Sequence, residues 1–389
     1  MKILGIDTSC DETAIAVLKV EREKFTILSN VIASQIPIHK KYGGVYPALA
    51  KREHQENLTK VLSLALQQAH LLIEAKPLLK KTSLPANLND IFKKEPILFQ
   101  KISSFLLKYK KPDIRLLAVT IGPGLEPCLW TGVNFARALS CFWKIPIVPI
   151  NHIEAHALVN YLNGEKIKLP ALALVVSGGH TQLFLIKKIG KYQILGETRD
   201  DAAGECLDKC AKILGFEYPG GPIISKLAQK AQNKKINFFL PKLPRPMINS
   251  KDYDFSFSGL KTALLYYNKK KKIKSTLLKM FLAQEIQQAV IDVLVKKTTR
   301  AIQEFNVRSV LVGGGVSANS ELRKRFKEQI QSHFPQISLF FPPPEFSTDN
   351  AVMVALTGYF LRKQKRNWKK IKAEANLKIS CSFYISQKF

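Results

Sequence analysis

The chain contains little cysteine, few acidic residues and no long apolar run. Its 389 residues include six cysteines, none of them in a CxxC pair, which argues against a disulfide framework. No apolar stretch reaches the ~18 residues that a membrane-spanning helix needs. The N-terminus starts with a strand-like segment and lacks the basic and apolar regions of a secretory signal. We therefore expect a cytoplasmic protein in a reducing environment.

The scarcity of acidic residues makes the chain strongly basic. Asp and Glu number 30 against 60 Lys and Arg, which gives a formal net charge of +30. Such a field attracts polyanions through phosphate neutralisation and counterion release. The charge favours a nucleic-acid partner, although a lysine-rich, solvated surface without a partner would have the same composition.

The rest of the composition is that of a globular protein. Hydrophobic residues make up 46% of the chain and charged residues 23%, which excludes extended disorder and a collagen-like structure. At ~100–200 residues per domain, the length allows about two to four domains.

Two halves of the sequence repeat one plan. Each half begins with an apolar strand, a turn of small polar residues and a second strand, and a third strand and helices follow. Each then continues with a strand, a Gly-rich turn and a helix, and ends with another strand and helix. In the first half we expect strands at 3–6, 14–20, 26–33, 116–121 and 145–150 and helices at 55–74, 132–142 and 151–162. In the second half we expect strands at 171–176, 182–186, 192–197, 309–312 and 337–341 and helices at 203–214, 221–231, 317–331 and 347–361.

This duplicated ββαβα plan predicts an α/β fold with largely parallel sheets, built as two lobes around a central cleft. We expect an N-terminal lobe at 1–165, a C-terminal lobe at 166–363 and a basic tail at 364–389. Residues 75–112 are polar, Lys-rich and interrupted by prolines, which predicts a surface insertion in the first lobe. Prolines in residues 238–254 likewise predict a loop.

His152 and His156 are four residues apart in an expected helix, so both imidazoles project from one face. This spacing suits two nitrogen ligands of one metal ion, and a pair of surface or packed histidines is the alternative. The segment does not match the zinc-protease HExxH motif, because Glu154 lies two residues after His152 and points away from that face. Asp349 is the best candidate for a third ligand, although an isolated aspartate at a helix start is more often a cap.

Gly-rich turns at 177–179 and 313–315 each follow an apolar strand. Such turns let backbone N–H groups surround an anion, and helix N-termini add partial positive charge. Neither turn matches GxxxxGK[ST], and no GxGxxG follows a strand, so P-loop and Rossmann folds are disfavoured. The first hairpin turn carries Asp7, Asp11 and Glu12, which can hold a cation or position a polar substrate, unless they serve only the turn itself.

Three further groups of residues have a less specific pattern. The acids at 200–205 and Asp208 lie at and near a helix start, where the helix dipole favours them in any case. The segment 255–262 places aromatic residues beside hydroxyls and a lysine. It could contact substrate or nucleic acid, or it could simply be the turn that enters a buried helix. Cys206 and Cys210, four apart on a helix, are expected to be buried apolar residues.

Nine blocks of the sequence together resemble one protein family. They are GIDTSCDET at 5–13, the pair His152 and His156, VSGGHTQL at 176–183, DDAAGE at 200–205, DK at 208–209, YPGGP at 218–222, FSFSGLKT at 255–262, GGGVSAN at 313–319 and STDN at 347–350. In this order they resemble the bacterial TsaD type of tRNA threonylcarbamoyladenosine transferase, formerly described as a glycoprotease. The resemblance runs from about residue 1 to residue 361, apart from the insertion.

The resemblance implies a fold, a reaction and a set of site residues. The fold would be the actin-like/Hsp70-like (ASKHA) two-lobed ATPase type, and the reaction would transfer threonylcarbamoyl from threonylcarbamoyl-AMP to N6 of the adenosine 3′ to the anticodon. His152, His156 and Asp349 would hold one divalent metal, iron or zinc. The residues implied to bind the adenylate are Val175, Val176, Ser177, Gly178, Gly179, Asp208, Gly221 and Asn319.

The family also implies partner proteins of the TsaB and TsaE types, and a TsaC-type enzyme that makes the intermediate. We expect Asp11 or Glu12 to act as the general base that helps the weakly nucleophilic amine. One departure from the family pattern is the run Leu125-Glu126-Pro127-Cys128, where relatives carry small residues after the Gly-Pro-Gly turn.

Two other functions compete with this interpretation. A small-molecule kinase of the same fold would need a cleft aspartate as base, and the turn at 177–179 carries no acid. A non-enzymatic nucleic-acid-binding scaffold would explain the charge of +30 but not the two histidines with Asp349.

Overall fold

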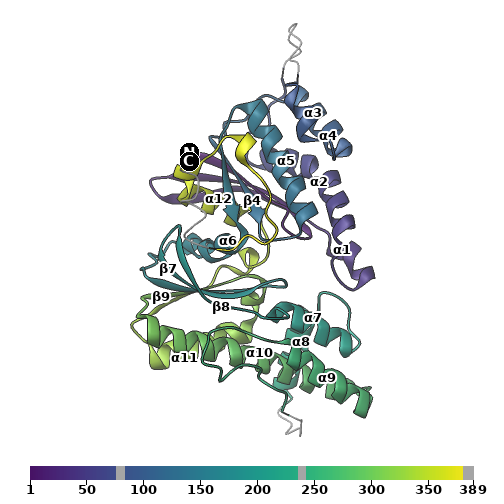
Figure 1. Ribbon diagram of the computed structural model, residues 1–389, viewed down its shortest axis with the longest axis vertical. Coiled ribbons are helices and arrows are strands. Elements are labelled where there is room, and N and C mark those ends of the chain that lie inside the picture. Colours follow the sequence, from purple (N-terminus) through teal and green to yellow (C-terminus); the bar gives the residue numbers. More distant parts are fainter. Residues whose placement is uncertain (76–83, 235–241, 380–389) are drawn as a thin grey trace. The chain divides into compact units, whose positions relative to one another are not determined.

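The computed structural model describes residues 1–75, 84–234 and 242–379, and the chain divides into two compact units. Unit 1 consists of Met1–Pro37, Val45–Gly164 and Asp349–Phe389, and unit 2 consists of Ile38–Gly44 and Glu165–Thr348. Each unit holds one five-stranded sheet (Figure 1).

The sheet of unit 1 has the strand order β3-β2-β1-β4-β5. The first three strands form an antiparallel meander, and β4 and β5 run parallel to β1. The strands are β1 (Lys2–Asp7), β2 (Glu12–Glu21), β3 (Lys24–Ser34), β4 (Leu116–Gly122) and β5 (Ile147–Asn151). The helical segments are α2 (Pro47–Gln68), α3 (Asn87–Ile91), α4 (Pro96–Lys108), α5 (Glu126–Trp143), α6 (His152–Leu158), η2 (Val159–Asn163), α12 (Ala351–Phe360), η5 (Arg362–Gln364) and η6 (Trp368–Lys370).

Helices cover both faces of this sheet. α2 and α5 pack on one face, where Leu4, Ile6, Ile15 and Val17 join their core. On the other face α12 lies so close to β1 that a Cβ on Gly5 would stand 2.2 Å from the carbonyl oxygen of Ala351. Burial on both faces explains why β1 and β4 are continuous apolar runs in the sequence.

Unit 2 repeats the topology with the order β10-β9-β6-β7-β8. Its strands are β6 (Ala171–Val176), β7 (Thr181–Lys188), β8 (Lys191–Glu197), β9 (Ser309–Gly313) and β10 (Ser338–Phe340). Its helical segments are α7 (Ala203–Ile213), α8 (Gly220–Gln232), α9 (Ser258–Lys271), α10 (Thr276–Phe305), η3 (Gly315–Ala318), α11 (Ser320–His333) and η4 (Pro344–Phe346), while α1 (Ile36–His39) and η1 (Lys40–Tyr42) lead from unit 1 into unit 2.

The shared strand order confirms the duplicated α/β plan, with one correction. Each sheet is mixed instead of largely parallel, because each opens with an antiparallel hairpin and a third antiparallel strand. The division into units also differs from the expected boundary near residue 363. Asp349–Phe389 belongs to unit 1, since α12 packs against β1, β2 and β4.

Two helices begin earlier than expected. α2 starts at Pro47 and α5 at Glu126, whereas the hydrophobic pattern predicted starts at 55 and 132. Both helices have a proline in their first turn, where its fixed φ and missing N–H fit a helix start. Glu126 also suits the positive end of the helix dipole. The unusual run at 125–128 is therefore compatible with a normal helix start.

The insertion at 75–112 contributes to the core of unit 1, which corrects the expectation of a surface segment; residues 76–83 of it lie outside the described part. Its buried apolar side chains are Leu88, Ile91, Phe92, Leu98, Ile102, Phe105 and Leu106. Glu95 is buried and accepts hydrogen bonds from Thr131 Oγ1 at 3.0 Å and Asn134 Nδ2 at 3.1 Å, both on α5. The inserted helices are thus attached to α2 and α5 by apolar packing and by a buried carboxylate.

The described part of the basic tail is packed against unit 1; residues 380–389 lie outside it. Arg366 N donates to Ile147 O on β5 at 2.7 Å, and Glu374 N donates to Ile121 O on β4 at 2.7 Å. Ile371, Leu377 and Ile379 are buried. The tail therefore supports the start of β5 and the end of β4, which leads to α5.

Among the helices of the described residues, none has the length and apolarity required to cross a bilayer.

Candidate functional site

Three parallel strands of unit 1 end at one edge of its sheet. β1 ends at Asp7, and β5 ends at Asn151 immediately before α6. The Asn151 side chain caps α6 by accepting from Ile153 N at 2.9 Å and Glu154 N at 3.2 Å, and its amide donates to Leu377 O at 3.3 Å. The cap and the tail together fix the start of the short helix that carries both histidines.

His152, His156 and Asp349 come together at this edge. The Nε2 atoms of the two histidines are 3.2 Å apart, and Asp349 Oδ1 lies 3.1 Å from His156 Nε2 and 3.5 Å from His152 Nε2. Both histidines are buried. The three side chains meet the geometric requirement for a group that could hold one metal ion.

Asp349 is not a helix cap. The side chain of Asn350 fills that position at the start of α12, where its Oδ1 accepts from Met353 N at 3.1 Å. The carboxylate of Asp349 points to the histidines instead. The sequence alternative of an ordinary capping aspartate is thereby excluded.

The donor set fits a divalent transition metal. Two ligand nitrogens at ~2.05 Å from one tetrahedral ion would be ~3.3 Å apart, close to the observed 3.2 Å. Imidazole and carboxylate are common ligands of both zinc and iron.

Asp7 lies behind His152. Its Oδ2 is 3.6 Å from His152 Nδ1, on the opposite side of the ring from Asp349. The other carboxylate oxygen accepts from Ser9 N at 3.1 Å. A carboxylate at the second nitrogen of a ligating histidine fixes the tautomer and orientation of the ring.

The pKa values in this cluster differ because of burial and charge. Burial alone would lower the pKa of His152, but the carboxylates of Asp349 and Asp7 raise it to about 9. Burial and the charge of His152 lower the pKa of His156. Burial raises the pKa of Asp7. Burial also opposes ionisation of Asp349, but the two histidines hold its pKa well below the usual range. The cluster favours a positive charge at the point where a metal ion would bind.

The turn after β1 is held against the start of α5. Thr8 Oγ1 donates to Cys128 O at 2.9 Å, and Leu125 N donates to Ser9 O at 2.8 Å. A Cβ on Gly132 would stand 2.2 Å from Thr8 Oγ1, so only glycine allows this approach.

Asp11 directly precedes β2, and Glu12 is the first residue of that strand. Asp11 is buried, and its carbonyl accepts from Gln35 N at 3.0 Å. Burial, followed by the charges of Asp349 and Asp11, raises the pKa of the Glu12 carboxyl well above its ordinary value. The structure thus brings both candidate bases to the same edge as the metal-ligand triad.

His54 on α2 supports the same turn, a role that the sequence analysis missed. Its Nδ1 is 2.7 Å from Thr13 Oγ1 and its Nε2 is 3.0 Å from Cys10 O. Because a carbonyl only accepts, Nε2 carries the proton and Nδ1 accepts from the threonine. The sequence did contain a signal for this buried position. Ala50 and Leu58 lie one helical turn before and after His54, which places His54 on the apolar face of the helix.

In unit 2, the expected adenylate residues gather around the start of α7. Val175 and Val176 end β6, and the turn of Ser177, Gly178 and Gly179 follows. Gly204 N donates to Ser177 O at 3.1 Å, and a Cβ on Gly204 would lie 2.6 Å from that oxygen. The turn therefore lies directly on the α7 N-terminus.

The remaining expected residues adjoin the same edge. Asp208 Oδ1 accepts from Gly220 N at 2.7 Å and Gly221 N at 3.1 Å, so its carboxylate occupies the start of α8. Asn319 caps α11 through Leu322 N at 3.0 Å and donates to Gln287 Oε1 at 2.7 Å. Hypothetical Cβ atoms on Gly178, Gly179 and Gly221 meet no described atom within 4 Å, so a ligand can approach these backbones.

The acids ahead of α7 serve two different purposes. Asp200 accepts from Ser258 N at 3.2 Å, Ser258 Oγ at 2.7 Å and Phe257 N at 2.8 Å, and so anchors α9. Asp201 pairs with Lys209 at 2.6 Å and with Lys261 at 3.5 Å. The segment 255–262 is thus the entry to a helix, which was one of its expected interpretations.

Cys206 and Cys210 are buried among apolar residues, as expected from the sequence. Their sulfur atoms are 4.0 Å apart.

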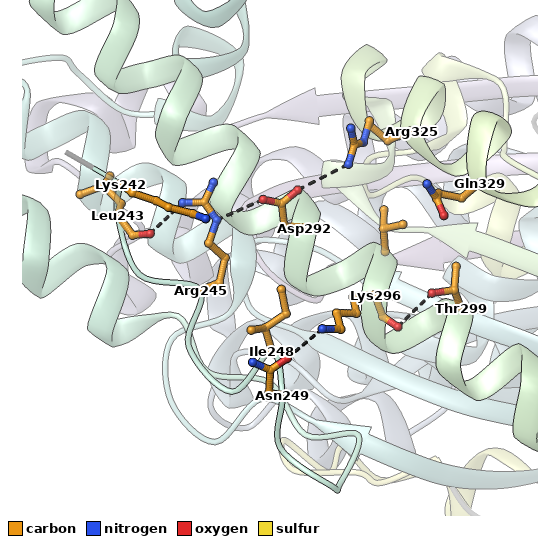
Figure 2. Close-up of a pocket in the computed structure, with 11 residues that line it drawn as sticks. Lys242, Leu243, Arg245, Ile248, Asn249, Asp292, Lys296, Thr299, Arg325 and Gln329 are labelled. Atoms are coloured by element: carbon orange, nitrogen blue, oxygen red, sulfur yellow. Dashed lines mark hydrogen bonds and ion pairs between the residues drawn. The ribbon is translucent and has the colours of Figure 1, made fainter. Parts of the chain in front are cut away.

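A pocket of about 690 Å³ lies elsewhere in unit 2, where residues 242–249 approach α10 and α11 (Figure 2). Arg245 Nε donates to Asp292 Oδ2 at 3.1 Å, and Arg325 lies 3.6 Å from the other oxygen of that carboxylate. Since Asp292 engages both arginines, the network braces residues 242–249 against α10. We assign the pocket a structural role outside the candidate site.

A family model described as "TsaD: tRNA N6-adenosine threonylcarbamoyltransferase" matches residues 26–76 and 102–356. The chain belongs to this family. The gap in the match falls on the insertion that carries α3 and the start of α4. The match includes the histidines, Asp349 and the Gly-rich turns of unit 2.

Curated TsaD relatives match over nearly their whole length. The tRNA N6-adenosine threonylcarbamoyltransferase of Thermosipho africanus is 42% identical over 364 residues, which cover 94% of this chain and 95% of the relative. The Bacillus subtilis protein of the same name is 42% identical over 360 residues, covering 92% and 90%. These names favour a transferase over the kinase and the scaffold.

Among solved structures, full-length HypF in its phosphate- and nucleotide-bound form has a TM-score of 0.51 at 10% identity. The likeness covers 92% of this chain and 46% of that one. At this identity it supports the fold alone, which is the actin-like/Hsp70-like type that the duplicated sheets define.

Proposed function

We propose that this TsaD protein transfers the threonylcarbamoyl group of threonylcarbamoyl-AMP to N6 of the adenosine 3′ to the anticodon, releasing AMP. The tRNAs would be those that read codons beginning with A. The observation that carries the proposal is the triad of His152, His156 and Asp349 at the strand ends of unit 1, in a chain whose family and relatives are named for this transfer.

The chemistry of the triad supports a metal-assisted transfer. A bound zinc or iron ion would supply Lewis acidity toward an oxygen of the activated donor. The protein's part is to hold the ligands rigidly: Asn151 caps the helix of both histidines, and Asp7 orients the ring of His152. Such fixed positions limit the reorganisation needed during reaction.

The edge of unit 2 supports binding of the adenylate. The turn at 177–179 lies at the α7 N-terminus, and Asn319 lies at the α11 N-terminus, where the helix dipole favours a phosphate. The carboxylate of Asp208 covers the start of α8, so it suits a ribose hydroxyl better than a phosphate. Val175 and Val176 would contribute apolar backing from β6.

Proton removal from the amine would fall to Asp11 or Glu12. Asp11 lies on the segment between β1 and β2, and Glu12 is the first residue of β2. A carboxylate at either position can accept the proton as the new bond forms. A mixed anhydride already has AMP as a good leaving group, so orientation and charge stabilisation are the main tasks of the protein.

The proposal includes partners and a location. Proteins of the TsaB and TsaE types would assist turnover, and a TsaC-type enzyme would supply the intermediate, as the family implies. Because its polymer substrate is tRNA, the protein would act in the cytoplasm.

The test is direct product analysis. Purified protein with threonylcarbamoyl-AMP and an unmodified tRNA transcript should yield threonylcarbamoyladenosine in nucleoside mass spectrometry, with TsaB- and TsaE-type partners added in a parallel reaction. A transcript with guanosine at the target position is the control and should remain unmodified. The proposal would be wrong if the protein phosphorylated a small molecule with ATP and formed no modified nucleoside, with or without the partner proteins.

A further inference from the structure

One long acid-free segment of unit 2 includes the whole of α9. Residues 255–284 contain seven lysines and no aspartate or glutamate. Lys269, Lys270 and Lys271 form the last turn of α9, and Lys274 follows in the connection to α10. All four side chains are exposed. Positive charge is therefore concentrated at one end of one helix.

A further lysine belongs to the same surface. Asn268 Nδ2 donates to Ile213 O at 3.2 Å, which ties the end of α9 to the end of α7. Lys212, exposed on the last turn of α7, therefore lies near the α9 lysines; Figure 1 shows α7, α8 and α9 alongside one another in unit 2. We call Lys212, Lys269, Lys270, Lys271 and Lys274 the α9 lysine surface.

An exposed aromatic ring adjoins these cations. Tyr266 is 65% exposed, although tyrosine in a stable fold usually buries its ring. Lys269 Nζ lies 6.0 Å from the centre of that ring. Exposed aromatic rings beside lysines are the combination with which proteins stack on unpaired bases while they neutralise the backbone.

The other end of α9 reaches the candidate adenylate edge. Asp200 holds Ser258 at the first turn of α9, and Asp201 pairs with Lys261 one turn on. These two acids directly precede α7, whose N-terminus carries the turn at 177–179. At ~1.5 Å per residue, Tyr266 lies about 12 Å along α9 from this edge and the lysines about 17–20 Å.

We propose that the α9 lysine surface binds the phosphate backbone of the tRNA substrate and that Tyr266 stacks on an unpaired base. The inference rests on the proposed function, which puts the reacting adenosine near the adenylate edge. At ~3.4 Å per nucleotide along a stacked strand, Tyr266 meets bases a few positions from the reacting one. The lysines meet phosphates about five or six positions away along the strand.

The first test removes three charges from the surface. The variant K269Q/K270Q/K271Q keeps Lys272, whose φ of 48° places it in the left-handed region at the helix end. K187Q/K188Q/K191Q is the matched control, because it removes three exposed lysines from the β7–β8 hairpin of the same unit. Circular dichroism and thermal melting would establish that both variants fold.

Fluorescence anisotropy with an unmodified tRNA transcript then measures affinity over a range of salt concentrations. For K269Q/K270Q/K271Q we expect Kd to rise about tenfold near 0.1 M salt and the log–log salt slope to fall by about 2, as for two to three lost phosphate contacts. The control variant should shift Kd by less than about threefold, through net charge alone.

The second test separates stacking from charge. Y266A should raise Kd about tenfold without changing the salt slope, since stacking contributes ~1–3 kcal/mol per base. Y266F keeps the ring and should bind within about twofold of the unaltered protein. Equal losses in Y266A and Y266F would exclude stacking and overturn this part of the proposal.

Measuring tRNA affinity and product formation separately distinguishes failure of the proposed RNA-binding surface from failure of the proposed transferase activity. H152A/H156A should bind tRNA normally but form no modified nucleoside, so binding and transfer are measured separately. If K269Q/K270Q/K271Q retains the affinity and slope of the unaltered protein, or loses no more than its control, the proposal is wrong. The surface would then suit an acidic protein partner better than RNA.

Discussion

At the scale of single residues, the candidate metal-ligand triad has a fourth side chain, Asp7, behind it. Asp7 is almost fully buried, and its Oδ2 faces His152 Nδ1 at 3.6 Å. The sequence named Asp7 as a member of an acidic turn, but only the structure places it behind a histidine 145 positions later in the chain. We propose that from this position the Asp7 carboxylate orients the ring and raises the basicity of the nitrogen that would bind the metal.

We predict that D7N weakens metal binding while the protein stays folded. Asparagine can still accept from Ser9 N, but it lacks the charge that faces His152, so affinity should fall about 10–100-fold. Competition of zinc with a chromogenic chelator measures the change. D113N, which alters an exposed aspartate of the same unit paired with Lys2, should bind zinc normally. Unchanged affinity in D7N would show that Asp7 has no part in the metal site.

His54 provides a second prediction at this scale. H54A removes a ring that joins Cys10 O to Thr13 Oγ1, and the threonine is fully buried. Leaving buried polar groups without partners costs about 1–3 kcal/mol, so the free energy of unfolding should fall by that amount in urea titrations. H333A, at an exposed histidine on α11, serves as control. Equal stability of the two variants would contradict the supporting role of His54.

At the scale of elements, the inserted helix α4 belongs to the core of unit 1. Adjacent residues allow a matched comparison: Leu98 is fully buried and Ile97 is 39% exposed. L98A should lower the free energy of unfolding by about 3 kcal/mol, since it leaves a cavity, and I97A by less than about 1 kcal/mol. Urea unfolding measures both. If L98A costs no more than I97A, the insertion packs only loosely on α2 and α5.

Asp200 gives a prediction on α9 with a defined pH dependence. Burial raises the pKa of Asp200, but hydrogen bonds from Ser256 and Ser258 outweigh it and hold the pKa below its ordinary value of 3.8. A lowered folded-state pKa adds stability above pH 3.8, and that stability is lost as pH falls through the lower value. D200N should therefore lower Tm at pH 7, with a gap to the unaltered protein that narrows below pH 4. A gap independent of pH would show that the charge of Asp200 is not what anchors α9.

Elements differed in how well the sequence predicted them. The hairpins and Gly-rich turns were predicted because strand alternation and glycine are strong local signals. The starts of α2 and α5 were placed too late, since the apolar pattern weakens in their first turns. The insertion was taken for a surface segment because its lysines and prolines mask the helical spacing of Leu98, Ile102 and Phe105, which becomes evident only when α2 and α5 lie beside it.

At the scale of the whole molecule, the triad illustrates what could be predicted from one chain. His152 and His156 were visible as a pair from their spacing alone, while Asp349 was named as the best candidate for a third ligand but could not be distinguished from a cap by sequence alone. Only the fold identifies Asp349 as the third member of the group. Almost 200 residues separate it from His156, and the two meet because α12 packs against the sheet that contains β1. The roles of Asp7 and His54 also depend on tertiary packing, so the sequence around each residue gives little indication of them.

The measurement that tests the central claim most directly combines metal analysis with product analysis on one set of proteins. The unaltered protein, H152A/H156A and D349A would each be assayed for bound metal by mass spectrometry and for threonylcarbamoyladenosine formed on tRNA from threonylcarbamoyl-AMP. We predict about one metal ion per chain and modified tRNA for the unaltered protein, and neither for the two variants. Full product from H152A/H156A without bound metal would contradict the account.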